Sequence, residues 1–441
     1  MIPKLPGSSW SRWEPRRGAS GWARRPRGSF PVSQPEPRRP LGASFRRVWL
    51  AVGISSTGDG MFLTAFPLLA ASLTRDAFLI AGVTIASRLP WLVFSLIAGA
   101  IADRVDRRRL MVTADVARCV VVAALGIVVL GHWAQIWLLY VCAFGLGVGE
   151  TLHTNAAQAI LPRLVESDQL VTANARLTST QVMTENFGGP PIGAALYSAA
   201  PSVPFLADAV SFVAASALAA TLPDVHGVDR PSTRLWADVR EGVRFTVSHR
   251  LLRRLAALLG VLNFFYFATE AVLILYTLER LHSGKAVFTA LFLAAAAGTV
   301  ATQWLVTPLQ RGVGAATTIV IAFWLWAIAL AGLSFTTSPL VAIGLFFTLG
   351  AGDGLWRVLT VTLRQTVTPN RLLGRVNSAY RMVAQGIIPL GAAFGGLTAK
   401  LLGIQGPFVI AAIVFVVIAL LGPALLRPVR ELTGARLDPY T

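Results

Sequence analysis

Charged side chains are scarce in this sequence. Asp, Glu, Lys and Arg make up 14% of its 441 residues, and hydrophobic residues make up 54%. An ordinary soluble domain has about 25% charged and about 45–50% apolar residues. The composition therefore excludes a soluble globular domain and predicts a polytopic membrane protein. Because one span needs roughly 20 apolar residues, the chain has room for about a dozen spans with short loops.

The sequence also lacks the residue patterns of common enzymes and of disulfide-rich proteins. Its two cysteines, Cys119 and Cys142, both fall inside apolar runs, so a disulfide framework is not indicated. No His is followed by Glu, which excludes an H-E-x-x-H zinc site, and Gly284-Lys285 has no phosphate-binding loop around it. We therefore expect no catalytic residues, no cofactor and no metal site.

Acidic residues are fewer than basic ones, and the formal net charge is +18. Such a charge can indicate nucleic acid as a partner, but most Arg residues lie in the tails and in alternate loops, and no nucleic-acid-binding fold is recognisable. Anionic lipids of the inner leaflet are the expected partner. By the positive-inside rule the Arg-bearing segments are cytoplasmic. We therefore expect a multi-pass protein of the plasma membrane, monomeric, with both termini in the cytoplasm.

The chain divides into five predicted segments. Residues 1–45 form a basic tail rich in Arg, Pro, Gly and Ser, for which we expect disorder. Two predicted halves of six spans each follow, over residues 46–222 and 251–427. Residues 223–250 link the halves, and residues 428–441 form a second tail.

The linker carries a predicted amphipathic helix. Its stretch LWADVREGVRF places Trp236, Val239 and Val243 at helical spacing among charged residues. Such a helix either lies on the inner leaflet or packs beneath the bundle, and the sequence leaves both arrangements open.

An internal repeat relates spans four and five to spans ten and eleven. Without a gap, the matched pairs are Phe144 and Phe347, Gly147 and Gly350, Glu150 and Asp353, Asn174 and Asn377, and Gly193 and Gly396. Registration of an Asn and an acid together with the Gly residues makes a chance match improbable. This is the parallel kind of repeat, in which two halves are related by an axis along the membrane normal.

Five acidic residues lie inside apolar stretches, where a carboxylate is costly and must be neutralised, paired or hydrated. They are Asp59, Glu150, Glu185, Glu270 and Asp353. We take them as candidates for proton or substrate coupling.

Two Arg residues in the same stretches are candidate partners for these acids. Arg357 is one helical turn from Asp353, which suits an i,i+4 contact, and Arg88 could serve Asp59. Glu150 has no Arg one turn away. We hypothesise that Glu150, with Asp353 as its symmetry mate, binds the coupling proton or a cationic group of the substrate.

A dense Arg block, GAIADRVDRRRL at residues 99–110, separates the second and third apolar runs. Its pattern Gly-x-x-x-Asp-Arg-x-x-Arg-Arg resembles the signature loop of the major facilitator superfamily of secondary transporters. The matching residues are Gly99, Asp103, Arg104, Arg107 and Arg108. Asp106 stands where many members have Gly.

That resemblance implies an all-α fold of twelve transmembrane helices in two six-helix halves, with spans one, four, seven and ten lining a central cavity. It also implies a gating role for the loop, with Asp103 near residues 373–377 and Arg375 as an additional ionic partner.

A second motif lies in span five, where GGPPIGA resembles the antiporter motif of exporters in the same superfamily. Gly189, Pro190 and Gly193 match it, while Glu185 and Ala194 replace its first and last Gly. Physically, the Gly residues permit a close helix crossing, and the Pro pair removes backbone donors and bends the helix. The Arg of the fourth span in proton-coupled drug exporters is missing, because Ala143 and Phe144 stand at its place.

The stretch RLLGRVNSAYR at residues 371–381 resembles the branch that holds macrolide-efflux proteins and the enterobactin exporter. The leading prediction is a proton-coupled antiporter that exports amphipathic small molecules, as in multidrug or macrolide efflux, by alternating access. The proton gradient is then the driving force. One alternative is a dedicated exporter of a single metabolite or siderophore, and another is a transport-dead membrane scaffold or sensor.

Overall fold

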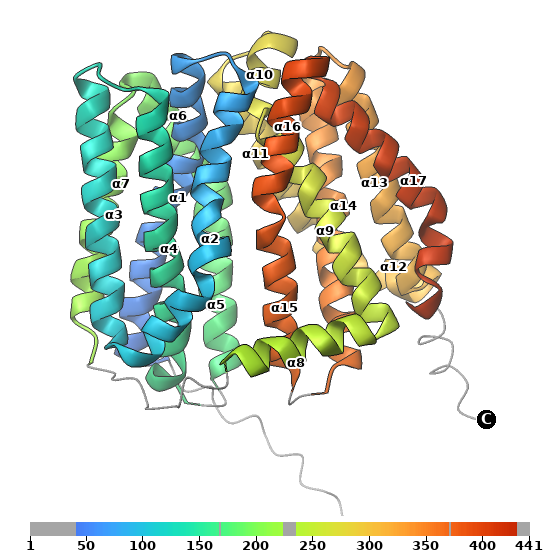
Figure 1. The fold of residues 1–441 in the computed structure, drawn as a ribbon, viewed down its shortest axis with the longest axis horizontal. Helices are drawn as coiled ribbons and strands as arrows, with labels where there is room; N and C mark the ends of the chain where they lie inside the picture. Colours follow the sequence, from blue (N-terminus) through green and yellow to red (C-terminus); the bar gives the residue numbers. More distant parts are fainter. Residues whose placement is uncertain (1–40, 167–168, 224–234, 370–371, 430–441) are drawn as a thin grey trace, which may run out of the picture. The chain divides into compact units, whose positions relative to one another are not determined.

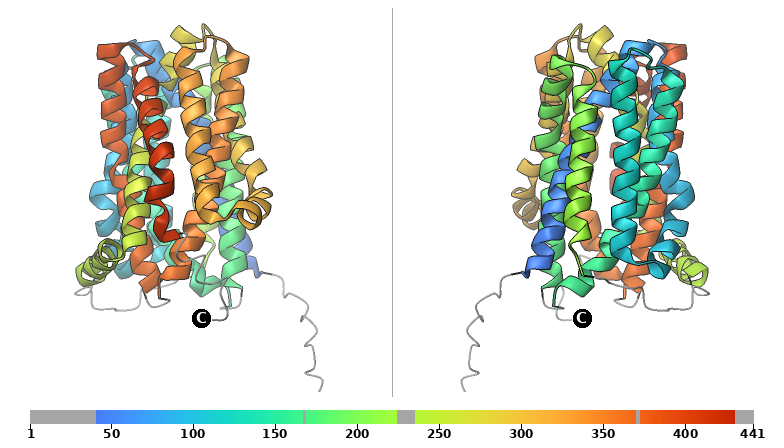
Figure 2. Two further views of the ribbon diagram at one scale, coloured as in Figure 1. Left: turned by 90° about the vertical axis from the view of Figure 1, so that its right-hand side faces the viewer. Right: turned by 90° about the vertical axis from the view of Figure 1, so that its left-hand side faces the viewer.

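The computed structural model describes residues 41–429, except 167–168, 224–234 and 370–371. All regular elements in those ranges are helices. They form two groups that run side by side, with α8 (Leu235–Ser248) lying across one end of the bundle (Figure 1). We call this end the α8 end and the opposite one the far end. The side views in Figure 2 show the same arrangement.

The N-terminal group consists of elements that pack mainly on one another. Its members are α1 (Ala43–Leu73), α2 (Ala77–Arg104), α3 (Arg107–Leu130), α4 (Ile136–Leu164), α5 (Leu170–Met183), the π-helix η1 (Thr184–Gly188), α6 (Gly189–Ala199) and α7 (Val203–Ala220). Helix α3 packs against α4 and α7, α1 packs against α6 and α7, and α2 packs against α4.

The C-terminal group follows α8. Its members are α9 (Arg250–Glu270), α10 (Leu273–Leu275), the π-helix η3 (Tyr276–Arg280), α11 (Lys285–Gln303), α12 (Val306–Val313), α13 (Ala315–Phe335), α14 (Pro339–Val367), α15 (Leu373–Gly386), α16 (Ile388–Leu402) and α17 (Gly406–Leu425). Here α11 packs against α14, α13 against α14 and α17, and α16 against α9. The groups meet mainly where α2 contacts α16.

Ten helical segments in the described part of the chain are long and apolar enough to cross a membrane. The ten lie within α2, α3, α4, α7, α9, α11, α13, α14, the joined α15–α16 and α17. The predicted polytopic membrane protein is thus confirmed at this level.

The fifth predicted span is not one regular helix. A π-helical turn at Thr184–Gly188 separates α5 from α6, directly before Pro190. In the C-terminal group, α15 ends at Gly386 and α16 begins at Ile388, with Pro389 in its first turn. Proline has no N–H to donate to the preceding turn, so the regular hydrogen-bond ladder is interrupted at both places.

Glycines allow close crossings in both groups. A Cβ added to Gly189 or Gly193 on α6 would overlap the backbone of α1 at Gly60 and Met61. A Cβ on Gly395 of α16 would likewise overlap the backbone of Ala268 on α9. The close crossing predicted for the second motif is therefore present, since only glycine lets two helix backbones approach this closely.

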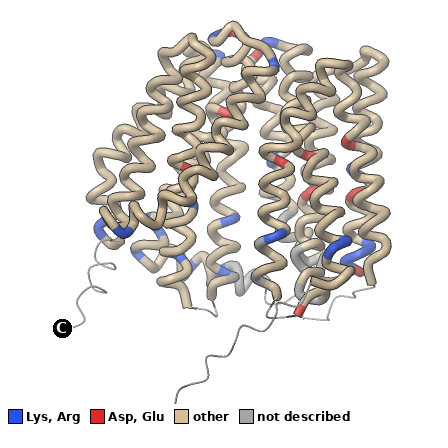
Figure 3. Tube along the Cα trace, turned by 180° about the vertical axis from the view of Figure 1, so that it is seen from behind, with Lys and Arg blue, Asp and Glu red and all other residues tan. Residues whose placement is uncertain are grey.

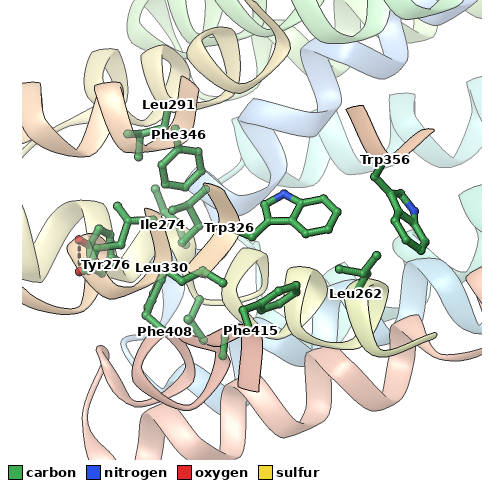
Figure 4. Close-up of a cluster of buried hydrophobic side chains, with 14 of the residues drawn as sticks. Leu262, Ile274, Tyr276, Leu291, Trp326, Leu330, Phe346, Trp356, Phe408 and Phe415 are labelled. Atoms are coloured by element: carbon green, nitrogen blue, oxygen red, sulfur yellow. Dashed lines mark hydrogen bonds between the residues drawn. The ribbon is translucent and has the colours of Figure 1, made fainter. Parts of the chain in front are cut away.

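The C-terminal group has an aromatic core (Figure 4). Trp326 of α13 lies 5.5 Å from Phe415 of α17 and 6.3 Å from Trp356 of α14, measured between ring centroids. Tyr276 packs on Phe408 at 4.5 Å, and its buried hydroxyl donates to the carbonyl of Leu333 at 2.7 Å. Aromatic pairs at such separations contribute beyond the area they bury.

The linker helix packs beneath the bundle, which was one of the two arrangements left open by the sequence. Helix α8 contacts α15 and α9, and Gly242 lies against the backbone of Arg375. Glu241 forms an ion pair with Arg375. The side chains of Trp236 and Val239 lie outside the described part of the structure. Figure 3 shows that Lys and Arg gather mostly near the α8 end, where the sequence places cytoplasmic loops.

Candidate functional site: a charged central cavity

A cavity of about 150 Å³ lies between the two helix groups. Helices α1, α2, α3, α4 and α7 line it together with η1, and α9, α10 and α11 line it from the C-terminal group. Five phenylalanines contribute apolar surface to its wall, namely Phe62, Phe66, Phe212, Phe288 and Phe292.

Ionisable residues form the rest of the wall, and acids predominate. The acids are Asp59, Glu150, Glu185, Asp208 and Glu270, and the cations are Arg88 and Arg118. Four of the five acids singled out in the sequence are thus brought to one cavity. Among the described residues, Asp353 is not part of its wall.

Asp353 instead lies in a local pair on α14. Arg357 Nε donates to its carboxylate at 2.6 Å across one helical turn, as the spacing predicts. The Arg357 side chain is 73% exposed within the protein and that of Asp353 is 35% exposed. The proposed symmetry relation between Glu150 and Asp353 therefore holds in the helix register but does not bring the two carboxyls to one cavity.

Asp59 pairs with Arg118 of α3 and not with Arg88, so the predicted partner is wrong. Arg118 is only 4% exposed, and its guanidinium carbon lies 4.1 Å from the centroid of the Phe212 ring. The physical reason is helix packing: α3 and α1 both pack on α7, and this places Arg118 beside α1. Arg88 lines the cavity from α2.

Three further ionisable residues lie next to this pair. Asp115, one turn before Arg118 on α3, is fully buried, and its Oδ1 is 3.8 Å from Arg118 Nη1. His153 of α4 places Nε2 3.6 Å from Asp115 Oδ2. Asp208 of α7 is also buried and accepts a hydrogen bond from the hydroxyl of Ser211 at 3.1 Å.

The sequence singled out none of Asp115, Arg118, His153 and Asp208 as site residues. Asp115 and Arg118 lie three positions apart in one apolar run, and His153 lies in the stretch ETLHTN. The contacts of Arg118 with α1 and of Asp115 with α4 depend on how the helices pack. The available signal was the i,i+3 spacing of Asp115 and Arg118 on one helix face.

Two cavity acids lie at helix irregularities. Glu185 is inside the π-helical turn η1, and Glu270 is the last residue of α9. Glu270 Oε2 is buried, with no hydrogen-bond partner among the described residues. Interrupted helices expose backbone groups, and inside a membrane such breaks are tolerated where they line a cavity.

The two groups also touch at the far end. Lys400 Nζ of α16 donates to Asp76 Oδ2, the residue that caps α2, at 2.7 Å. That hydrogen bond holds the pKa of the Asp76 carboxyl below its usual value of 3.8. Lys285 of α11 lies 5.2 Å from the ring centroid of Tyr197 on α6. These contacts cross between the groups at the end opposite α8.

The Arg block forms the turn between α2 and α3. Asp106 caps α3 by accepting from the N–H of Arg109 at 3.1 Å, which gives this acid a structural role where Gly is common. Arg108 donates to the carbonyl of Leu222 at 3.0 Å. The side chains of Gly99, Asp103 and Arg104 lie outside the described part of the structure, so the gating contact of Asp103 stays a prediction.

The sequence matches a known protein family over nearly its whole length. Residues 38–438 match the family model described as "Transmembrane secretion effector". The chain belongs to this family. It is a transporter of the major facilitator superfamily and not an enzyme. Within the described residues, no group of three or more His, Cys, Asp or Glu side chains is arranged to hold a metal ion.

Curated relatives of this transporter cover most of its length. Macrolide efflux protein A of Streptococcus pyogenes is 22% identical over 88% of this chain and 97% of its own length. The multidrug efflux pump Tap of Mycolicibacterium fortuitum is 24% identical, over 80% of this chain and 88% of its own. The enterobactin exporter EntS of Citrobacter koseri is 26% identical, over 81% and 86%.

Solved structures share the transporter fold at low sequence identity. A mutant of the nucleoside transporter NupG matches with a TM-score of 0.72 and 10% identity, covering 87% of this chain and all of that one. A bacterial homologue of the lysosomal transporter Spinster matches with a TM-score of 0.66 and 13% identity, covering 88% of this chain and 97% of its own. At this identity the likeness concerns the fold alone.

Proposed function

We propose that this transporter is a proton-coupled exporter of amphipathic small molecules that works by alternating access. The observation that carries the proposal is the cavity between the two helix groups, whose wall combines five phenylalanines with five acids. Aromatic surface suits the apolar part of an amphipathic solute, and buried carboxyls suit exchange of a proton or contact with a cationic group. Relatives named as efflux proteins support the export direction.

The proposed topology has twelve spans in two halves of six. The two spans beyond the ten apolar helices are α1, which has 31 residues, and the interrupted α5–η1–α6. Both carry cavity acids, Asp59 and Glu185, and acids make a segment less apolar. Basic residues near the α8 end then put that end, and both termini, in the cytoplasm of a plasma-membrane protein.

Contacts at the far end indicate which state of the proposed transport cycle the structure corresponds to. The pair between Asp76 and Lys400 and the contact between Lys285 and Tyr197 join the two groups there. In the proposed topology the far end is outside. The structure then corresponds to a state whose outer side is closed, and transport requires these contacts to separate while the α8 end closes.

The deciding experiment is transport by purified protein in proteoliposomes with an imposed pH gradient and a chemically diverse panel of solutes. We expect several amphipathic solutes to accumulate against their gradient, and we expect a protonophore to abolish that accumulation. A pH-sensitive dye should report one-for-one or higher proton movement in the opposite direction. Including anionic lipid in half of the preparations tests the proposed lipid partner, and the mass of the protein in nanodiscs tests the proposed monomer.

Three other outcomes are informative. Transport of a single solute class would favour a dedicated exporter, a reading to which the relative named enterobactin exporter lends support. Accumulation that does not depend on the imposed pH gradient would contradict proton coupling. If the folded protein transports no member of the panel, the result favours the interpretation as a membrane scaffold or sensor. A Glu279→Gln variant is a suitable control, since this exposed acid lies in η3 at the far end and away from the cavity.

A further inference from the structure

The charges around Arg118 do not balance. Arg118, Asp115 and Asp208 are each more than nine-tenths buried, and Asp59 contacts the same guanidinium. Three carboxyls thus share one buried cation. An ionised carboxylate away from water is costly unless an opposite charge and hydrogen bonds compensate it. The cluster therefore requires a further proton or cation besides Arg118 to compensate its carboxyls.

Asp115 is the least satisfied member of this cluster. Its Oδ1 lies 3.8 Å from Arg118 Nη1, and its Oδ2 lies 3.6 Å from His153 Nε2. Both distances are longer than the donor–acceptor distance of a hydrogen bond. Within the described part of the chain, neither oxygen has a hydrogen-bond partner. Asp115 thus lies between two cationic or potentially cationic groups and is bonded to neither.

Arg118 can reach either carboxylate. Its Nη2 is bonded to Asp59, while its Nη1 is already directed towards Asp115. A small rotation of the guanidinium would close the remaining gap of about 1 Å to hydrogen-bond length. Arg118 Nε has no hydrogen-bond partner among the described residues, and the guanidinium also contacts the face of the Phe212 ring.

These groups are also ordered along the transport axis. Helix α3 begins at the α8 end, and Asp115 lies about 12 Å along it, while Asp59 lies about 24 Å along α1 from the same end. Asp59 lines the cavity, whereas Asp115 does not appear in the described part of its wall. The series from Asp59 through Arg118 to Asp115 therefore leads from the cavity towards the α8 end, and His153 lies beside Asp115, about 17 Å from the end of α4.

We propose that Asp115 and His153 form a proton-binding site, and that Arg118 couples this site to the cavity by moving between Asp59 and Asp115. The proposal rests on the proposed function, because it takes the proton as the coupling ion. In the observed arrangement Arg118 pairs with Asp59. In the first state of the proposed cycle a proton on His153 compensates Asp115. When a proton binds to Asp59, Arg118 loses its partner and bonds to Asp115. His153 then releases its proton towards the α8 end.

The step conserves charge and atoms. One proton is gained by a carboxylate oxygen of Asp59 and one is lost from an imidazole nitrogen of His153, while Arg118 keeps its charge throughout. Other charged groups around the cavity keep their charge in this step and influence its energy. They are Glu150 on α4, Glu185 in η1, Asp208 on α7 and Arg88 on α2.

The experiment measures the titration of His153 directly, by nuclear magnetic resonance of the full-length protein in nanodiscs with isotope-labelled histidine. The chain has five histidines, and His153→Gln assigns the signal. We expect Asp59→Asn to lower the pH at which His153 binds its proton by one unit or more, about a tenfold change. The neutral Asn releases Arg118 to Asp115, which leaves His153 without a free anionic partner.

A matched variant separates this movement from simple loss of negative charge. Glu150→Gln also removes one carboxylate, and Glu150 is one turn from His153 on the same helix. A purely electrostatic effect predicts that Glu150→Gln shifts His153 at least as much as Asp59→Asn does. Movement of Arg118 predicts a clearly larger shift in Asp59→Asn. His282→Asn is a control at an exposed position of positive φ that Asn tolerates.

If the titration of His153 shifts no more in Asp59→Asn than in Glu150→Gln, the proposal that Arg118 moves between Asp59 and Asp115 is wrong. If Asp59→Asn fails to fold, Asp115→Asn provides the second test, because it removes the partner of His153 and should shift its titration in the same direction. Proteoliposome transport is measured in parallel. Gradient-independent transport by the wild-type protein would contradict the proposed function, whereas an indifferent His153 titration contradicts only the present inference.

Discussion

The two helix groups use equivalent positions in opposite ways. Helices α4 and α14 have 29 residues each, and they begin and end at matched positions of the internal repeat. In that register the residues of the cluster around Arg118 correspond to C-terminal residues that carry no charge. The pairs are Asp59 and Leu262, Asp115 and Thr318, Arg118 and Ile321, His153 and Trp356, and Asp208 and Ala411.

The C-terminal counterparts belong to a packed interior. Leu262, Trp356 and Ala411 are buried members of the core that also contains Trp326 and Phe415. Burying an apolar side chain stabilises a helix bundle through close packing, whereas burying an ion costs several kcal/mol unless it is compensated. The difference is that the N-terminal group buries a cluster of ionisable residues where the C-terminal group buries an apolar and aromatic core.

The largest expected difference between the two groups is the loss of stability when Arg118 or Arg357 is replaced. Arg118→Leu should destabilise the protein by about 3–5 kcal/mol, because it leaves buried carboxylates without their cation. Arg357→Leu removes the more exposed partner of Asp353, and should cost less than about 1 kcal/mol. Thermal unfolding of the purified proteins in one lipid composition measures both. Similar losses would mean that the buried cluster is no more dependent on its cation than a surface pair.

A feature shared by the two groups should respond equally in both. Gly193→Ala and Gly395→Ala each place a methyl group against the backbone of a crossing helix. We expect each to destabilise by about 1–3 kcal/mol. Gly344→Ala on α14 is the control, because a Cβ there meets no atom within 4 Å. Tolerance of alanine at only one of the two crossings would show that the groups are packed differently.

The two acids matched by the repeat should differ in function. Glu150→Gln should reduce proton-driven accumulation about tenfold or more, equivalent to ~1.4 kcal/mol of coupling, while the protein stays in the membrane. Asp353→Asn should change it less than about twofold, because Asp353 lies outside the described cavity wall. Accumulation in proteoliposomes at a fixed pH gradient is the measurement. Wild-type accumulation by Glu150→Gln would direct attention to Asp59, Glu185 or Glu270.

Local features of this fold follow from the sequence, and long-range ones do not. Apolar runs and the glycine motifs are visible because each depends on residues close along the chain, and the repeat is visible because the two halves share a pattern of residue types. Arg357 was correctly paired with Asp353 because one helical turn separates them. Arg118 was missed as the partner of Asp59 because the two lie 59 positions apart, on helices whose contact depends on how α1, α3 and α7 pack.

The smallest expected effect concerns the contact between the two groups at the far end. The pair of Asp76 and Lys400 is partly exposed, with the Lys400 side chain 55% exposed, and such pairs contribute about 0.2–1 kcal/mol. Asp76→Asn should therefore loosen the far end only slightly. Spin–spin distances between labels on α2 and α16 measure the fraction of molecules with the far end open, and Gln in place of Glu279 is the control.

The pH dependence of this contact should also differ from that of the buried cluster. Lys400 holds the pKa of Asp76 below 3.8, so Asp76 is ionised, and the pair is intact, throughout the range from pH 5 to 8. Its contribution is lost only as the pH falls through the lowered pKa. Between pH 5 and 8 we expect the open fraction of Asp76→Asn to differ from wild type by a constant factor. A factor that changes across this range would show that the far-end contact, and not only the cluster around Arg118, senses the proton.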